Sequence, residues 1–192
     1  MKYNTKGFSL IEVLVTLLLT TIGILGMVAL QSSGVRYTQD AINRNNAIAF
    51  TNDLIEIMRQ YPDEFWEHTA EVRYNKLKNA TALYKASGEI NVAASACPST
   101  DVPQTVSAQV ACWLQRVENA LPGASVSAKS KIRVCPSMSL NNNGEIACAG
   151  NNFRGSSMGV QLAWEVRPGE CMDDSDDNAT NTICTYQTRF EL

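Results

Sequence analysis

The sequence predicts an α+β fold in which a long N-terminal helix packs on an antiparallel β-sheet within a domain stapled by disulfides. Three observations indicate this fold. Apolar and then amphipathic segments with helical spacing occupy the first 61 residues. Segments of alternating and β-branched residues occupy the last third, separated by Gly-, Asn- and Asp-rich stretches. All six cysteines lie at or beyond Cys97, which indicates an oxidising compartment for that part of the chain.

An apolar run, FSLIEVLVTLLLTTIGILGMVAL, extends from Phe8 to Leu30 with Glu12 as its single charge. A helix of these 23 residues would be about 34 Å long, enough to cross a hydrocarbon core of about 30 Å. The run is longer than the apolar core of a secretory signal and carries a carboxylate, which disfavours cleavage after it. A plain membrane anchor would have to bear about 2.5–3.5 kcal/mol for an acidic group at the bilayer centre. Glu12 is therefore expected to have a partner.

The helical pattern continues through residues 31–61 as an amphipathic segment. Asp40 with Arg44, and Glu56 with Arg59, have the spacing of ion pairs on its more solvated side. One broad stripe is expected to face a core: Val35, Ile42, Ile48 or Ala49, Ile55 and Met58.

Pro62 is expected to end this helix, and residues 63–96 are expected to form short helix and loop. Their apolar side chains are expected to make a satellite of the core: Phe65, Trp66, Val72, Leu77, Leu83 and Tyr84. A second helix is predicted over residues 105–121, ending at Leu121-Pro122-Gly123. Its apolar positions recur at helical intervals: Val106, Val110, Trp113 or Leu114, Val117 and Leu121. Strands of an antiparallel meander are predicted within 129–137, 157–167 and 182–192.

The six cysteines allow 15 connectivities if all are paired. Separations of 15, 13 and 13 residues suggest sequential bridging: Cys97 to Cys112, Cys135 to Cys148, and Cys171 to Cys184. Metal ligation by these thiols is disfavoured, because the sequence has no closely spaced pair such as C-x-x-C with histidines. No cofactor is expected.

The sequence carries no motif of a hydrolase, a nucleotide-binding loop or a metalloprotease, and its one histidine, His68, is interpreted as a surface or boundary residue. An enzyme is therefore not expected, nor a small-molecule substrate. A weak calcium candidate is the loop with Asp174, Asp176 and Asn178, which lacks the glycine and the bidentate glutamate of a calcium loop. With 16 basic and 19 acidic residues, the chain lacks the basic excess expected of a nucleic-acid partner.

The stretch KGFSLIEVL, residues 6–14, resembles the class III signal of type IV prepilins and type II secretion pseudopilins. The resemblance implies that a prepilin peptidase cleaves between Gly7 and Phe8 and that Phe8 is then N-methylated. It also implies that Glu12 neutralises the N-terminal ammonium of a neighbouring subunit during assembly. A type IV pilin-like fold is implied as well.

The resemblance implies four segments: a cleaved leader, 1–7; a membrane-spanning and assembly half-helix, 8–30; an amphipathic half-helix, 31–61; and a periplasmic α+β domain, 62–192. The wider chain resembles the PilV family of minor pilins, the type IV pilus modification proteins. The resemblance rests on the IEVLV…IGILGM…AL helix, on Cys112-Trp113, on Leu121-Pro122-Gly123-Ala124, on Leu162-Ala163-Trp164 and on a terminal hairpin bounded by cysteines.

Members of that family join other minor pilins and the major pilin in an inner-membrane or tip complex. That complex primes pilus assembly and supports twitching motility and adhesion. The location implied is the bacterial inner membrane with a periplasmic domain, or the pilus tip at the cell surface. Two alternatives stay open: a minor pseudopilin of a type II secretion system, and a tip adhesin or DNA-uptake receptor.

Overall fold

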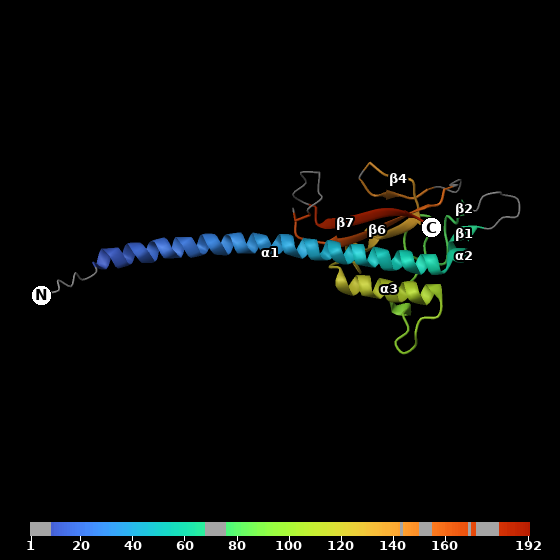
Figure 1. Cartoon of the computed structure of the whole chain (residues 1–192), viewed down its shortest axis with the longest axis horizontal. Coiled ribbons are helices and arrows are strands. Elements are labelled where there is room, and N and C mark those ends of the chain that lie inside the picture. The colour runs from blue at the N-terminus through green and yellow to red at the C-terminus, as the bar shows by residue number, and fades with distance from the viewer. Residues whose placement is uncertain (1–8, 68–75, 143, 150–154, 169, 172–180) are drawn as a thin grey trace, which may run out of the picture. The chain divides into compact units, whose positions relative to one another are not determined.

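The computed structural model describes residues 9–67, 76–142, 144–149, 155–168, 170–171 and 181–192 of the chain. They divide between two compact units, Met1–Gln39 and Asp40–Leu192, and the boundary falls within the first helix, α1 (Leu10–Gln60). Figure 1 shows the order of the elements along the chain. The predicted α+β class is confirmed, because the second unit combines helices with an antiparallel sheet and three disulfides.

The main sheet has three antiparallel strands in the order β3 (Arg133–Pro136), β6 (Ser157–Glu165) and β7 (Ile183–Glu191). The register between β6 and β7 is continuous, from Ser157 opposite Glu191 to Glu165 opposite Ile183. Two small pairs accompany the sheet. They are β1 (Trp66–Glu67) with β2 (Lys76–Leu77), and β4 (Ser139–Leu140) with β5 (Ile146–Ala147).

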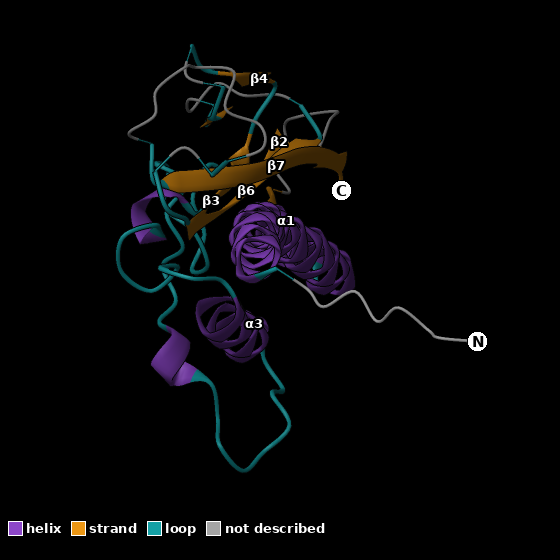
Figure 2. Ribbon diagram, turned by 90° about the vertical axis from the view of Figure 1, so that its left-hand side faces the viewer, coloured by secondary structure: helices purple, strands orange, loops and turns teal. Residues whose placement is uncertain are grey.

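Two longer helices pack with the sheet, and Figure 2 shows the C-terminal half of α1 between the sheet and α3 (Val106–Ala120). The hydroxyl of Thr105 accepts a hydrogen bond from the Ala108 amide and caps the start of α3. The predicted apolar positions of α3 and its end at Leu121 are all buried, so this second helix is confirmed. A short helix, α2 (Pro62–Phe65), follows α1 directly, with Pro62 at its first turn.

The prediction of which face of α1 is buried is wrong. Val35 and Ile42 are exposed, and Met58 alone of the predicted set is buried. The buried face instead follows Asp40, Asn43, Ala47, Thr51, Leu54 and Met58. Asp40, expected on the solvated side, is 4% exposed and accepts a hydrogen bond of 2.9 Å from the Trp164 indole. A polar residue can occupy a helix face toward the core when tertiary neighbours supply its hydrogen bonds.

Two further expectations need correction. Phe65, Leu77, Leu83 and Tyr84 belong to the main hydrophobic core and not to a satellite, because the same cluster contains α1, α3 and the sheet. The ring of Phe65 stacks on that of Tyr84 with centroids 6.3 Å apart. The segment Lys129–Lys131, expected at the start of a strand, is a 3-10 turn, η2.

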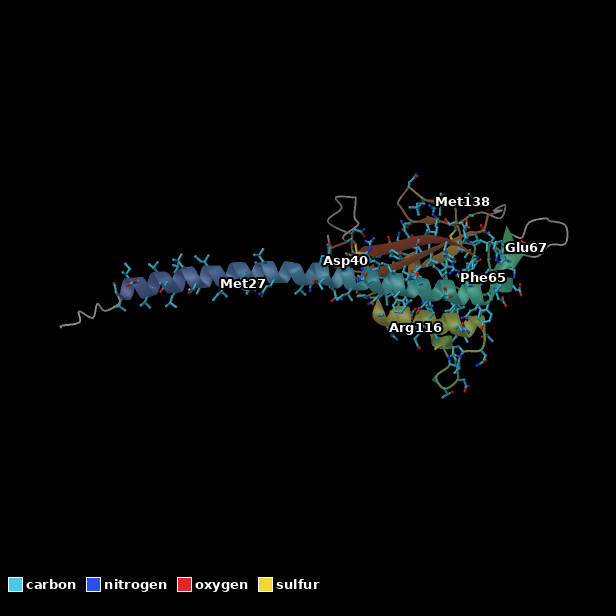
Figure 3. The ribbon with its side chains drawn as sticks, in the orientation of Figure 1. Met27, Asp40, Phe65, Glu67, Arg116 and Met138 are labelled. Atoms are coloured by element: carbon cyan, nitrogen blue, oxygen red, sulfur yellow. A yellow bond between two sulfur atoms is a disulfide. The ribbon has the colours of Figure 1, made fainter. Side chains whose placement is uncertain are left out.

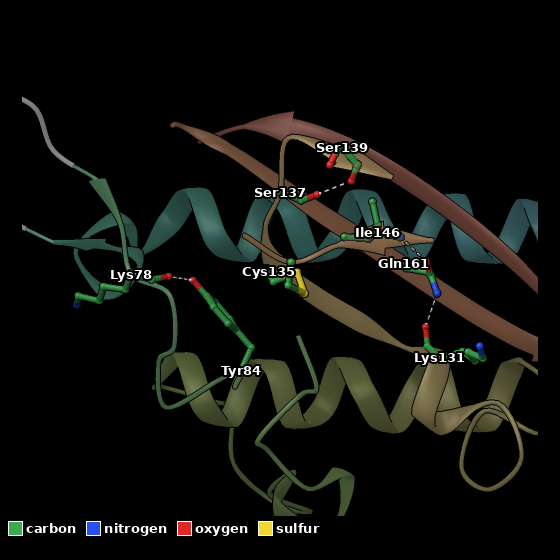
Figure 4. The surroundings of a disulfide bond; sticks show 9 residues. Lys78, Tyr84, Lys131, Cys135, Ser137, Ser139, Ile146 and Gln161 are labelled. Atoms are coloured by element: carbon green, nitrogen blue, oxygen red, sulfur yellow. Dashed lines mark hydrogen bonds between the residues drawn. A yellow bond between two sulfur atoms is a disulfide. The ribbon is translucent and has the colours of Figure 1, made fainter. Parts of the chain in front are cut away.

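The disulfides join Cys97 to Cys112, Cys135 to Cys148 and Cys171 to Cys184, the pairs that the sequence spacing suggests. The first ties a short 3-10 turn, η1 (Ala94–Ala96), to α3. Figure 4 shows the second, beside the buried side chain of Gln161. That amide donates to the Lys131 carbonyl and accepts from the Ile146 amide, both at 2.9 Å, and so links β6 to η2 and β5.

Candidate assembly helix

The first unit consists, among its described residues, of the N-terminal part of α1. The Ser9 carbonyl accepts hydrogen bonds from the amides of Glu12 and Val13 at 3.0 and 3.3 Å and so starts the helix. The expected processing residues, Gly7 and Phe8, lie outside the described part of the chain. Glu12, the other expected site residue, lies in the first turn of α1.

Apolar side chains surround this part of α1 on all sides. The span Leu10–Gln31 has a mean hydropathy of 2.5 and no residue buried within the molecule. Figure 3 shows Met27 among side chains that point outward from the helix. By length and composition the span is able to cross a membrane. Such a surface is costly in water, so lipid or other helices are expected to cover it.

The polar side chains within this span are arranged for an apolar environment. The hydroxyls of Thr16, Thr20 and Thr21 donate to backbone carbonyls three residues earlier, at 2.8–3.0 Å. Each hydroxyl proton is thereby satisfied within the helix itself, as a hydrocarbon environment requires. These threonines need no external partner.

Glu12 differs from these threonines, because it carries an acidic side chain that is exposed at the start of the apolar span. No basic side chain in the described part of the chain pairs with it. A carboxylate inside hydrocarbon is stabilised only by a cationic or hydrogen-bonding partner. The helix therefore offers one acidic group on an otherwise apolar surface, which suits a cation from another molecule.

The described part of the globular unit contains an open hollow of about 410 Å³. Its floor is apolar, and its rim carries Lys85 and Glu89, which pair at 2.8 Å. The hydrogen bond from Lys85 lowers the pKa of the Glu89 carboxyl below its ordinary value. Lys129, which also lines the cavity, pairs with Glu118 at 3.4 Å.

Metal and catalytic candidates find no support in the described residues. Among them, no three His, Cys, Asp or Glu side chains gather as a metal site, and all six cysteines are in disulfides. His68 and the calcium candidates Asp174, Asp176 and Asn178 lie outside the residues that the structure describes.

Several landmarks of the wider resemblance are core residues of the second unit: Trp113, Leu121, Ala124, Leu162, Ala163 and Trp164. Trp113 is fully buried and donates to the Phe50 carbonyl of α1 at 2.7 Å, and Trp164 donates to Asp40. Buried Leu121 and Ala124 flank the Pro122-Gly123 pair, and Gly123, with a φ of +69°, makes the turn after α3. Sequence reasoning found these residues but not the two indole hydrogen bonds, since each joins segments more than 60 residues apart.

Comparison with protein families identifies a match to the prokaryotic N-terminal methylation motif over residues 2–28. No curated protein and no solved structure matches the chain significantly. The matched residues include Gly7, Phe8, Glu12 and most of the apolar span. The chain thus carries the N-terminal motif of a type IV pilin-like prepilin, which supports a pilin or pseudopilin in general, processed by a prepilin peptidase and anchored in a membrane.

Proposed function

We propose that this protein is a minor pilin of the type IV pilus, similar to PilV, that joins other minor pilins and the major pilin in a complex that primes pilus assembly. The observation that carries the proposal is the N-terminal methylation motif on an apolar helix whose one charge is Glu12. The chain acts by association: the apolar helices bundle, and the disulfide-stapled domain supplies side contacts. Its role in twitching motility and adhesion follows from that assembly.

The domain organisation follows the same proposal. Residues 1–7 are the leader, residues 8–30 anchor and assemble, and residues 31–61 are the amphipathic half of the helix. Residues 62–192 form a domain in the periplasm or at the pilus tip. The three disulfides support an oxidising location for this domain.

The mature N-terminus tests the processing step. Mass spectrometry of the chain from membranes or sheared filaments is expected to find a chain that starts at N-methylated Phe8. A start beyond Leu30 would instead show cleavage by an ordinary secretory peptidase. The unprocessed chain, with Met1 to Gly7 retained in a strain with an active prepilin peptidase, would also contradict the proposal.

The role of Glu12 is tested by Glu12→Gln, which keeps the shape of the side chain and removes its charge. We expect normal cleavage and a loss of incorporation into the complex, because the ammonium of Phe8 on a neighbouring chain loses its counter-ion in hydrocarbon. Thr16→Val is the matched control on the same helix, since its hydroxyl is satisfied internally. Equal incorporation of both variants would refute the role of Glu12.

A minor pseudopilin of a type II secretion system shares the whole N-terminal argument. Deletion of the gene separates the two assignments. Loss of surface pili and twitching supports the pilus assignment, whereas loss of protein secretion with pili retained supports the pseudopilin.

A further inference from the structure

The two edge strands of the main sheet, β3 and β7, differ in whether their outward backbone groups have hydrogen-bond partners. The β3 edge is closed: the outward amide of Val134 donates to the Gly88 carbonyl at 2.8 Å. Pro136 has no backbone N–H to donate, and its carbonyl accepts a hydrogen bond from the Ala149 amide at 2.7 Å. The β3 edge is also short, with four residues. The β3 edge therefore has few free backbone donors and acceptors with which another strand could pair.

Most outward backbone groups of the β7 edge have no partner among the residues that the structure describes. The amide of Val166 bonds the Thr182 carbonyl, and that of Leu192 bonds the Ser156 carbonyl, so even-numbered residues of β7 make the ladder with β6. The odd-numbered residues therefore direct their N–H and C=O groups away from the sheet. Ile183 is capped by the Asn181 side chain at 3.2 Å. The backbone groups of the next four odd residues meet no partner in the described part of the chain: Thr185, Gln187, Arg189 and Glu191.

This edge lacks several of the devices that usually prevent strand pairing. It spans nine residues in unbroken register, without proline, lysine or a bulge. The long side chains do not cover it, because Gln187 and Arg189 donate to the carbonyls of Gly144 and Met138 in the segment around the β4–β5 pair. The open part, from Thr185 to Glu191, is about 20 Å long at about 3.4 Å per residue.

We propose that the β7 edge, residues Thr185 to Glu191, receives an extended strand from a neighbouring pilin subunit, which adds to the sheet as its fourth main strand. The proposal rests on the proposed function. A row of evenly spaced donors and acceptors is matched by another extended backbone.

Side chains along the edge define the incoming strand. Tyr186 and Phe190 are half-buried against the core on one face of β7, so the strand carries apolar residues on that face. Arg189 and Glu191 are exposed on the other face. An acidic residue opposite Arg189 and a basic residue opposite Glu191 complete the match.

Hydrogen exchange on the full chain tests the pairing, with the purified chain in detergent compared with the chain in isolated pilus assemblies. In the purified chain the outward amides of Thr185, Gln187 and Arg189 are expected to exchange fast, and the ladder amide of Tyr186 slowly. In the assemblies the outward amides are expected to slow at least about tenfold, the factor of one hydrogen bond. Exchange that stays fast in assembled chain would overturn the proposal and leave the proposed function intact.

Thr185→Pro removes one outward donor, and Thr185→Ala is its matched control, because it keeps the amide and loses the same hydroxyl. Proline is tolerated at outward positions of an edge strand, and slow exchange at Tyr186 verifies the fold of each variant. We expect Thr185→Pro to incorporate about tenfold less than Thr185→Ala. Equal incorporation would overturn the proposal, as would concentration-dependent protection in the purified chain, which would show a second copy on this edge. If the wild-type chain did not incorporate into pilus assemblies, the proposed function would be refuted, and the proposed strand pairing with it.

Discussion

Replacement of Gly88 by alanine is expected to destabilise the globular unit strongly, because two costs coincide there. Gly88 has a φ of +87°, where a residue with a side chain is strained by about 1–2 kcal/mol. An added Cβ would lie 2.6 Å from the Cys148 sulfur and 3.3 Å from that of Cys135. The disulfide cannot move aside as the end of a flexible side chain can, so overpacking adds about 1–3 kcal/mol. The free energy of unfolding should fall by about 2–5 kcal/mol.

Gly144 supplies the control, because it has a φ of +72° but no atom within 4 Å of an added Cβ. Gly144→Ala should therefore show the backbone cost alone, about 1–2 kcal/mol. Thermal unfolding of the full chain in detergent, followed by near-ultraviolet circular dichroism, measures both variants without reductant. The extra packing cost of about 2 kcal/mol should lower the Tm of Gly88→Ala about 4–8 °C below that of Gly144→Ala. Equal Tm values would refute the argument that Gly88 is required by contact with the disulfide.

Two further predictions concern buried polar contacts. Trp164→Phe removes the indole hydrogen bond to the buried side chain of Asp40 and should cost about 1–3 kcal/mol, more than Trp113→Phe, whose acceptor is a helix carbonyl. Equal losses in urea unfolding would contradict this. The hydrogen bond from Lys131 holds the pKa of the Glu145 carboxyl below its usual 4.5. Because the folded pKa is depressed, the ionised carboxylate stabilises the fold above pH 4.5, and this contribution is lost as pH falls through the folded pKa. The Tm gap between wild type and Glu145→Gln should therefore shrink below pH 4.5, and a gap that is independent of pH would contradict the assignment.

Local sequence patterns predicted most of the elements. The apolar and amphipathic stretches indicated a helix through residue 61, and α1 ends at Gln60, next to Pro62. The apolar spacing of residues 105–121 indicated α3, which spans Val106–Ala120. The β4–β5 pair was missed, because two-residue strands carry too few side chains to show a period.

The candidate site at the start of α1 could be identified from the sequence without the tertiary structure. A carboxylate in an apolar run is visible in the residues themselves, and so is the glycine–phenylalanine pair before it. The structure adds that Glu12 stands in the first turn of α1 and that the threonine hydroxyls are satisfied within the helix. The carboxylate of Glu12, unlike these hydroxyls, needs a partner from another molecule.

The sequence by itself determined the fold class, the two long helices and the assembly motif, because each depends on residues close together in the chain. Tertiary structure alone decided which face of α1 is buried. That face carries Asp40, Asn43 and Thr51 among its apolar residues, and Asp40 is accommodated because Trp164, far along the chain, donates to it. Tertiary structure also decided that Gly88 and Ala149 close the β3 edge and that, among the described residues, none pairs with the outer edge of β7 from Thr185 to Glu191. Both outcomes depend on hydrogen-bond partners brought together by folding, and no local pattern records them.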